Sequence, residues 1–234
     1  MRLCYFCLLL YRDNDMIRIL HTADWHLGQT FFGYDRTKEH EAFLDWLLRE
    51  IRKNEIDALI IAGDVFDVSN PSAASQRMYY EFIYRVTAEN PGLQIVIVAG
   101  NHDSAARLEA PLPLLQAMRT EVRGVVRKLN EGEIDYDHLA VELKNREGEV
   151  EVLCMAVPFL RQGDYPVVET EGNPYMEGVR ELYTQLLQRL WARRKTNQAI
   201  LAIGHLQATG SEIAEKDYSE RTVIGGLECV SPDT

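Results

Sequence analysis

The sequence has few cysteines and no long apolar run. Its four cysteines, Cys4, Cys7, Cys154 and Cys229, form no cluster of the kind that binds structural zinc. Cys4 and Cys7 have CxxC spacing, but the Tyr-Phe between them and their apolar setting argue against a metal or redox role. Cys154 lies in an apolar run and is expected to be buried. A reducing compartment, the cytoplasm, is therefore the expected location.

The sequence also has fewer basic than acidic residues. The 234 residues include 25 Lys and Arg against 36 Asp and Glu, which gives a formal net charge of −11. Such a field repels polyanions and argues against a protein that coats DNA through charge alone. It remains compatible with an enzyme whose acidic groups bind metal ions. Hydrophobic residues make up 46% and charged residues 26%, without repeats or low-complexity segments, as is typical of a globular protein with a sizeable core.

The first fifteen residues, MRLCYFCLLLYRDND, resemble a short signal-peptide core but lack a small-residue cleavage site. Their apolar run is too short to span a bilayer. Because Met16 begins a segment typical of a first strand, we expect residues 1–15 to be a non-native extension and 16–234 to form the domain. The rival interpretation is that these residues are a membrane anchor.

From Met16 onward, strand and helix patterns alternate. Strands are predicted at 17–20, 57–62 and 94–99 from their apolar runs. Helices are predicted at 36–53 and 72–88, where apolar residues recur every three or four positions. This β-α-β-α-β order predicts an α/β fold with mostly parallel central strands.

The middle of the chain changes character. Shorter β-type runs at 122–128, 138–144 and 149–157 predict a second sheet that is partly antiparallel. A third helix is predicted at 175–194, with Trp191 among its regularly spaced apolar residues, and a strand follows at 198–203.

Four of the predicted strands end in a short polar cluster, within ILHTADWH, IIAGDVFD, IVAGNHDS and LAIGHLQ. The carboxyl ends of strands in open α/β sheets line the crevice where ligands bind. If the four strands share one sheet, six side chains meet there: Asp24, His26, Asp64, Asn101, His102 and His205. In an extended segment residues two apart point the same way, so Asp24 and His26 would face one ion while Trp25 turns away into packing.

The residue types in this group favour metal chemistry. Carboxylate, amide oxygen and imidazole ligands suit Mn²⁺, Fe²⁺ or Zn²⁺ rather than a structural thiolate site. A carboxylate can bridge two ions, and pairs of ions about 3.5–4 Å apart are widely used for phosphoester cleavage. Taken singly, Asp24 is more often a turn or helix N-cap residue than a ligand, Asp64 is typical of a turn, and His205 of a partly buried histidine. It is the combination that predicts a dimetal site.

The motifs DWH (24–26), GDVFD (63–67), GNHDS (100–104) and GH (204–205) resemble those of the calcineurin-like metallophosphoesterases. The longer stretches LHTADWHLGQ and EHEAFLDWLL resemble a bacterial branch of nuclease subunits that work with an ATPase of the structural-maintenance type. The resemblance implies a layered αββα sandwich and two divalent metal ions, with Mn²⁺ as the expected metal. It also implies exonuclease and hairpin endonuclease activity on DNA in repair and recombination, and a nuclease dimer bound to two ATPase subunits.

Carried over residue by residue, the resemblance implies that Asp24 and His26 bind the first metal and that Asp64 bridges both. Asn101 and His205 would bind the second.

The resemblance also implies roles for the neighbours of these ligands. His102 would be catalytic, stabilising the transition state or protonating the leaving oxygen. Asp103 would orient its neighbours. Asp67 stands where eukaryotic and archaeal relatives carry a histidine, and we interpret it as a supporting residue.

The sequence also departs from the family pattern. The family has a later Gly-His-x-His element with a further ligand for each metal, whereas the histidines here are residues 21, 26, 40, 102, 138 and 205. The DNA-binding cap and the partner-docking segment would follow that element, so we expect a domain that is incomplete at its C-terminus. Two alternatives stay open. One is another metallophosphoesterase that acts on small phosphodiesters or phosphoproteins, and the other is an inactive fragment or binding module with an incomplete metal site.

Overall fold

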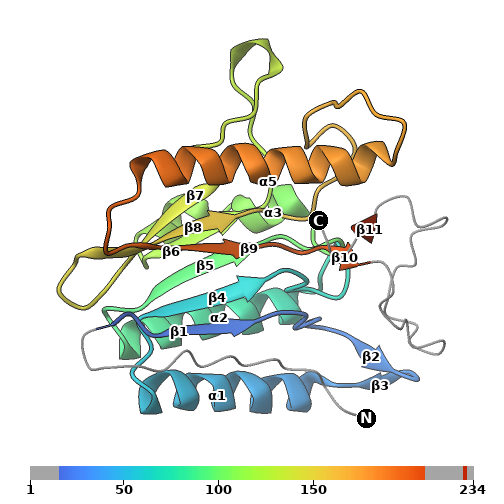
Figure 1. The fold of residues 1–234 in the computed structure, drawn as a ribbon. Helices are drawn as coiled ribbons and strands as arrows, with labels where there is room; N and C mark the ends of the chain where they lie inside the picture. The colour runs from blue at the N-terminus through green and yellow to red at the C-terminus, as the bar shows by residue number, and fades with distance from the viewer. Residues whose placement is uncertain (1–15, 209–228, 231–234) are drawn as a thin grey trace.

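The computed structural model describes residues 16–208 and 229–230, arranged as two β-sheets that pack face to face between outer helices (Figure 1). The expectations for residues 1–15, including Cys4 and Cys7, lie outside this range. None of the helices within it is long and apolar enough to cross a membrane.

The first sheet contains four parallel strands. They are β1 (Ile19–Thr22), β4 (Ala58–Ala62), β5 (Gln94–Val98) and β6 (Thr120–Arg123), in the order β1-β4-β5-β6. All residues of β4 are buried, as expected for a central parallel strand covered on both faces. The predicted parallel arrangement is confirmed.

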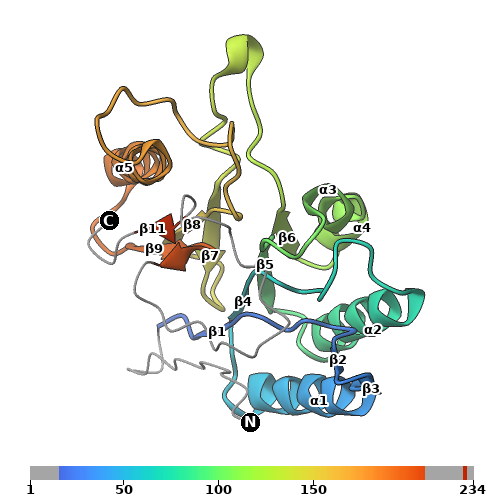
Figure 2. The same ribbon diagram turned by 90° about the vertical axis from the view of Figure 1, so that its right-hand side faces the viewer.

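Helices α1 (Thr37–Lys53) and α2 (Ala73–Glu89) cover the outer face of this sheet (Figure 2). Their apolar positions, spaced three and four residues apart, are buried as the sequence predicts, for example Phe43, Leu47 and Ile51 of α1. The Ser72 side chain caps α2 by accepting a hydrogen bond from the Ser75 backbone N–H at 3.1 Å. Two short helices, α3 (Ala105–Glu109) and α4 (Leu112–Gln116), were not predicted.

The second sheet contains β7 (Ala140–Lys144), β8 (Val150–Ala156) and β9 (Ala199–Ile203). The β7–β8 pair is antiparallel and the β8–β9 pair is parallel, which confirms a partly antiparallel second sheet. Helix α5 (Pro174–Arg193) covers its outer face through Leu182, Leu186 and Leu190. The expectation that Trp191 shares this buried stripe is wrong. Trp191 follows Leu190 by about 100° around the helix and is 63% exposed.

Small apolar side chains fill the space between the sheets. Ala58, Ala62 and Val96 of the first sheet pack against Cys154 and Ala156 of the second. Cys154 is fully buried, as predicted. With helices outside both sheets, the layer order is αββα, and the predicted layered sandwich is confirmed.

Two predictions about strand partners are wrong. The run at 122–128 was assigned to the second sheet, but its first residues belong to β6, at the edge of the first sheet. Strand β9, which precedes His205, was placed with β1, β4 and β5, but it pairs with β8 in the second sheet. An apolar run identifies a strand, whereas its neighbour is decided by packing between distant parts of the chain.

The remaining elements are short. They are β2 (Thr30–Phe31), β3 (Tyr34–Asp35), the 3-10 turn Asn130–Gly132, β10 (Gln207–Ala208) and β11 (Cys229–Val230). Strands β2 and β3 form a hairpin between the β1 segment and α1, which the sequence interpretation missed.

Candidate metal centre

The six predicted site residues follow the carboxyl ends of β1, β4, β5 and β9. The segment after β1 lies against the segment after β4, with hydrogen bonds from Asp24 N to Gly63 O (3.1 Å) and from His26 N to Asp64 O (2.9 Å). The site therefore lies at one end of the sandwich, where loops of the first sheet meet the β9 loop of the second.

The backbone at this edge is not extended. Asp24, His26 and Asp64 all have positive φ, at 56°, 45° and 50°, a conformation that non-glycine residues rarely adopt. The expectation that this segment is extended is therefore wrong, and the assignment of Asp24 and His26 to one ion stays a prediction. Such strained positions concentrate at functional sites, because the surrounding structure must hold them there.

Trp25, between the two, is buried as predicted. It is 2% exposed and packs edge-on against Phe43 and Phe82, with ring centroids 5.8 and 5.3 Å away. Its indole N–H donates to the Thr22 hydroxyl at 3.1 Å. This anchor fixes the strained segment to the core formed by α1 and α2.

Two glycines let the segments approach each other. A Cβ at Gly100 would lie 2.0 Å from Asp64 Oδ1, and one at Gly63 would lie 2.2 Å from His205 Nδ1. Gly63 also has a φ of +90°. Any residue other than glycine at position 63 or 100 would displace the His205 or the Asp64 side chain.

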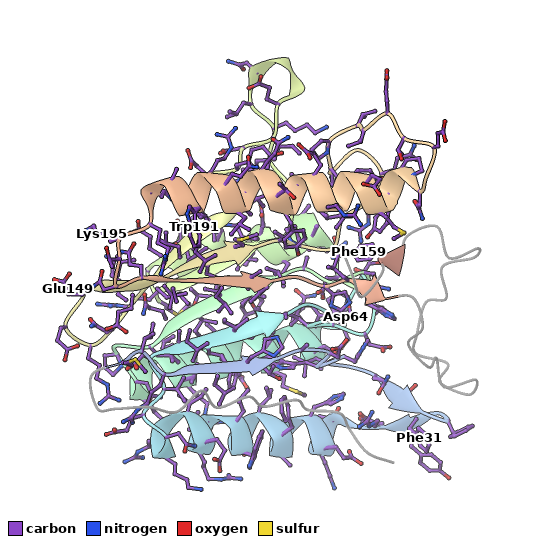
Figure 3. The ribbon with its side chains drawn as sticks, viewed as in Figure 1. Phe31, Asp64, Glu149, Phe159, Trp191 and Lys195 are labelled. Atoms are coloured by element: carbon purple, nitrogen blue, oxygen red, sulfur yellow. The ribbon has the colours of Figure 1, made fainter. Side chains whose placement is uncertain are left out.

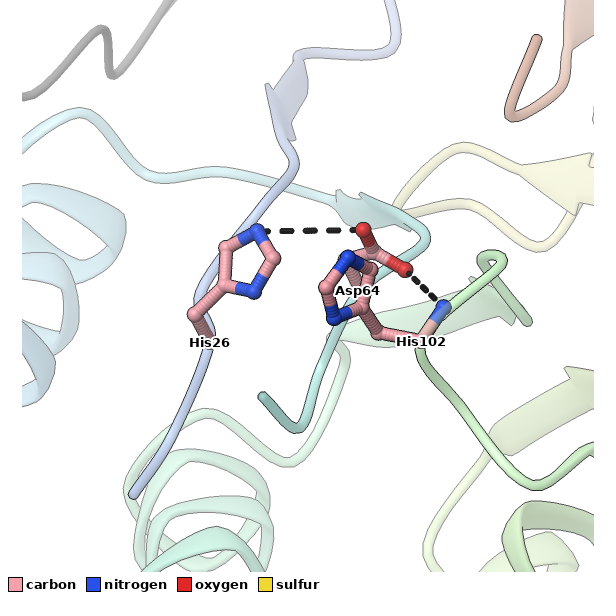
Figure 4. A group of neighbouring side chains, drawn as sticks. All are labelled: His26, Asp64 and His102. Carbon is pink, nitrogen blue, oxygen red and sulfur yellow. Dashed lines mark hydrogen bonds and ion pairs between the residues drawn. The ribbon is translucent and has the colours of Figure 1, made fainter. Parts of the chain in front are cut away.

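Asp64 lies at the centre of the site and is 3% exposed. Its Oδ1 accepts a hydrogen bond from the His102 backbone N–H at 2.9 Å. Its Oδ2 lies 3.4 Å from His205 Nε2 and 3.7 Å from His26 Nε2, so the carboxylate contacts three histidines. Figure 4 shows its contacts with His26 and His102. Burial alone would raise the pKa of Asp64, but His205 and the His102 N–H outweigh this and lower it.

His205 is oriented as metal-binding histidines usually are. Its Nδ1 lies 3.0 Å from the Ala62 carbonyl oxygen, which can only accept, so Nδ1 carries a proton. Nε2 is left facing Asn101 Oδ1 at 3.1 Å and Asp64. Burial alone would lower the pKa of His205, but the Asp64 carboxylate outweighs it and raises the pKa to about 9.

His26 and His102 also lie beside Asp64. Their rings meet edge-on with centroids 4.9 Å apart. His26 Nδ1 lies 3.4 Å from Asp67 Oδ1, and His102 Nδ1 donates to the Asp67 carbonyl oxygen at 2.7 Å. Asp67 thus lies against both rings, with its carboxylate near His26 and its backbone carbonyl bonded to His102.

Asp103 fixes the loops rather than the ligands. It is 2% exposed, and its carboxylate accepts backbone hydrogen bonds from Gly100 (2.9 Å), Val65 (3.2 Å) and Phe66 (3.0 Å). Its contacts join the loop after β4 to the loop after β5, as an orienting residue should.

Two groups of side chains have ligand atoms within 4.8 Å of one another: His26 with Asp64 and His102, and Asp24 with Asp64 and His205. Asp64 belongs to both. Asn101 adjoins the second group through His205. The sequence interpretation paired Asp24 with His26, whereas the distances group Asp24 with His205.

The donor set fits divalent cations. Carboxylate oxygens and imidazole nitrogens surround one spot, and the excess of carboxylates draws protons to the neighbouring histidines. Burial alone would lower the pKa of His26, but Asp67, Asp64 and Asp24 raise it. The negative charge that raises these histidine pKa values also attracts metal cations. Asp64 belongs to both ligand groups, so two cations could share its carboxylate.

Arg161 is a residue at this site that the sequence interpretation missed. It lies in the loop after β8, with its guanidinium over the Phe159 ring at 5.3 Å and Nη2 3.5 Å from the Asn101 carbonyl oxygen. Phe159 is itself fixed, because its N–H donates to Ala99 O at 2.8 Å and its ring lies 6.3 Å from that of His205. The sequence offers no local signal for this contact, since 60 residues separate Arg161 from Asn101.

Comparisons with known proteins identify the class. The family model for calcineurin-like phosphoesterases matches residues 17–226, and the chain belongs to this family. Its membership implies divalent metal binding, for which the two groups around Asp64 provide ligands.

Within the family, the chain is similar to proteins named as the SbcD component of the nuclease SbcCD. It is 38% identical over 224 residues to the one from Rhodobacter capsulatus, covering 93% of this chain and 54% of that protein. It is 44% identical over 220 residues to the Bacillus subtilis protein (93% and 53%) and 32% identical over 219 residues to that of Escherichia coli K12 (91% and 51%). The resemblance that the motifs indicated is confirmed. The chain spans about half the length of these relatives.

Proposed function

We propose that this chain is the catalytic domain of a metal-dependent DNA nuclease of the SbcD type. The observation that carries the proposal is the position of Asp64, which is shared by two groups of ligands and held there by the His102 N–H. The similarity to the SbcD proteins supports DNA as the substrate, with double-strand exonuclease and hairpin or single-strand endonuclease activity in repair and recombination.

The proposed metal ligands are Asp24, His26, Asp64, Asn101 and His205. When bound, two divalent ions, Mn²⁺ in our proposal, would neutralise charge on the scissile phosphate. The chain's own residues keep their donors in place. Asp103 ties the loops together, Asp67 holds the two rings beside Asp64, and the Ala62 carbonyl fixes the tautomer of His205.

His102 is the proposed proton donor. Because its Nδ1–H is engaged by the Asp67 carbonyl, Nε2 is the atom left to exchange a proton with the leaving oxygen. The same contact fixes the ring orientation. Asp67 therefore supports catalysis through His102 as well as through His26.

Arg161 is the proposed ligand of a substrate phosphate beside the metals. An arginine is always charged and presents a planar fork of donors, which suits a phosphodiester. Its stacking on Phe159 holds the guanidinium near Asn101. In a protein of net charge −11, a positive group at the site would add to the attraction that bound metal ions exert on an anionic substrate.

The proposed partner is an ATPase of the SbcC type, with two copies of each protein in a heterotetramer. The similarity to proteins named as components of SbcCD supports it. The proposed location is the cytoplasm, where such a nuclease would meet DNA.

The decisive experiment measures metal binding and cleavage in the same samples. With Mn²⁺, we expect the wild-type chain to bind metal and cleave DNA. Asp64→Ala should lose bound metal by elemental analysis and lose cleavage, and His102→Ala should lose cleavage by about 100-fold or more. Both variants should keep the wild-type circular dichroism spectrum. Asp45→Ala, which removes an exposed carboxylate paired with Arg85, is the matched control and should behave as wild type.

The same samples separate the alternatives. Cleavage of bis(p-nitrophenyl) phosphate without cleavage of DNA would favour a phosphodiesterase of small substrates. Metal binding without any cleavage would favour an inactive domain. Undiminished cleavage by His102→Ala would contradict its assignment.

A further inference from the structure

The β2–β3 hairpin presents three aromatic rings to solvent. Phe31, Phe32 and Tyr34 are 45%, 75% and 74% exposed. Phe31 pairs across the hairpin with Tyr34, and the rings of Phe31 and Phe32 meet edge-on at 4.6 Å. Single exposed aromatics are common, but three within four residues form a patch that calls for a ligand or a partner.

The turn of this hairpin is strained to keep a ring at its tip. Phe32 and Gly33 form the two-residue loop, with φ values of 49° and 80°. Positive φ at both loop positions is typical of a type I′ turn, for which Asn-Gly is the favoured sequence. A phenylalanine at the first position is disfavoured by the backbone, and its ring is largely exposed, so folding does not explain it.

Hydrogen bonds at both ends connect the hairpin to the candidate metal centre and to α1. It begins four residues after His26, and the Gln29 N–H donates to the His26 carbonyl at 2.9 Å. At its other end the Asp35 carboxylate accepts from the Thr37 N–H at the start of α1, at 2.8 Å, and Arg36 donates to the Gln29 side chain. Figure 3 shows Phe31 projecting outward at the same end of the molecule as Asp64.

The spacing matches a nucleic acid bound at the centre. Phe32 follows His26 by six positions, and a chain spans at most about 3.3–3.6 Å per residue, so the backbone at the tip lies within about 22 Å of that of His26. A stacked strand rises about 3.4 Å per nucleotide, which puts the rings within about six nucleotides of the scissile phosphate.

We propose that Phe31, Phe32 and Tyr34 stack on unpaired bases of the DNA that is being cleaved. This inference rests on the proposed nuclease function and adds to it a contact that selects single-stranded or frayed ends. Aromatic rings stack on any base without needing positive charge. An acidic protein whose overall field repels DNA gains most from such a contact.

Binding can be tested apart from cleavage. Wild type and variants are titrated in EDTA with fluorescent oligonucleotides that carry 2-aminopurine, either single-stranded or as a blunt duplex. Phe32→Asn creates the favoured Asn-Gly turn while it removes the ring, so its melting temperature should equal or exceed that of wild type. We expect its affinity for the single strand to fall between about 5-fold and about 100-fold, with little change for the duplex.

Control variants sharpen the result. The combined variant Phe31→Ser, Phe32→Asn, Tyr34→Thr should lose the 2-aminopurine signal of the single strand. Trp191→Ala removes an exposed ring from α5, at the opposite end of the molecule from Phe31, and should bind as wild type (Figure 3). Bis(p-nitrophenyl) phosphate is too small to reach the hairpin, so its hydrolysis should be unchanged in all hairpin variants.

Single-strand binding by the combined variant that equals wild type would overturn the inference. So would a fall in native mass of the variant without loss of DNA affinity, because the rings would then form a protein interface. If wild type with Mn²⁺ cleaves no DNA, the proposed function fails, and the EDTA titration still reports on the hairpin by itself.

Discussion

At the residue scale, substitution of Arg161 tests the proposed phosphate binding separately from metal binding. Arg161→Ala should raise the KM for DNA by about 10-fold and leave bound metal unchanged, because the side chain approaches Asn101 through its backbone carbonyl. The slope of log affinity against log salt concentration should become shallower by about 1, the change expected for the loss of one phosphate contact. Steady-state kinetics and titrations at several salt concentrations measure both.

Two substitutions control this result. Arg161→Lys keeps the charge without the planar fork and should recover part of the affinity. Arg194→Ala removes a guanidinium that also stacks on an aromatic ring, Trp191 at 5.1 Å, but at the C-terminal end of α5 rather than at the site. If both alanine variants raise KM equally, Arg161 has no particular role in binding phosphate.

Glu109 is a second residue whose charge has a measurable consequence. Its Oε1 accepts backbone hydrogen bonds from Gly124 (2.8 Å) and Val125 (3.2 Å), and the side chain is 13% exposed. Burial alone would raise the pKa of Glu109, but His138, these N–H groups and Arg127 outweigh it and lower the pKa to about 2. The folded state therefore holds this proton less tightly than the unfolded chain does.

A lowered pKa stabilises the fold at pH values above the unfolded pKa, and this contribution is lost as the pH falls through the folded pKa. Glu109→Gln should therefore reduce the free energy of unfolding near pH 7 by on the order of 1–3 kcal/mol, and the difference from wild type should shrink between about pH 5 and about pH 2. Urea denaturation at a series of pH values tests this. The exposed Glu147→Gln is the control, and an equal loss of stability at every pH would contradict the charge argument.

At the element scale, the start of α5 depends on one cap. Asn173 Oδ1 accepts from the backbone N–H groups of Tyr175 (2.9 Å) and Met176 (3.5 Å), and Pro174 fills the first helical position, where no N–H is needed. Asn173→Ala should reduce the free energy of unfolding by about 1 kcal/mol. Gln188→Ala, at an exposed position in the same helix, should change it by less than about 0.5 kcal/mol in a parallel urea titration.

At the scale of the whole molecule, Cys154 reports whether the two sheets stay closed. It lies between them with 0% exposure, and burial raises the pKa of its thiol to about 12. In a background with Cys4, Cys7 and Cys229 changed to serine, a thiol reagent should label it only through opening of the sandwich. The labelling rate should rise with urea in parallel with global unfolding. Complete labelling within the mixing time in native buffer would mean that the sheets open independently.

Much of the fold was predictable because it is encoded locally. The helical spacing of Phe43, Leu47 and Ile51 and the apolar run of β4 identify α1 and a buried strand without any knowledge of their partners. Polar residues after apolar strands, such as Asp64 and Asn101, identified the edge where a site would form.

Other features depended on contacts between distant segments. Strand β9 pairs in the second sheet, and His205 meets Asn101 across 104 residues. Short-range periodicity cannot specify either.

The sequence by itself determined the residue types at the candidate site, the layered α/β class and the family. The tertiary structure decided which side chains group around Asp64, that Asp24 and His26 are held in left-handed conformations, and that Arg161 reaches the same place. The physical reason is that a residue's chemistry and local periodicity belong to its own segment. Distances across a site are set by how two sheets pack and where their loops meet.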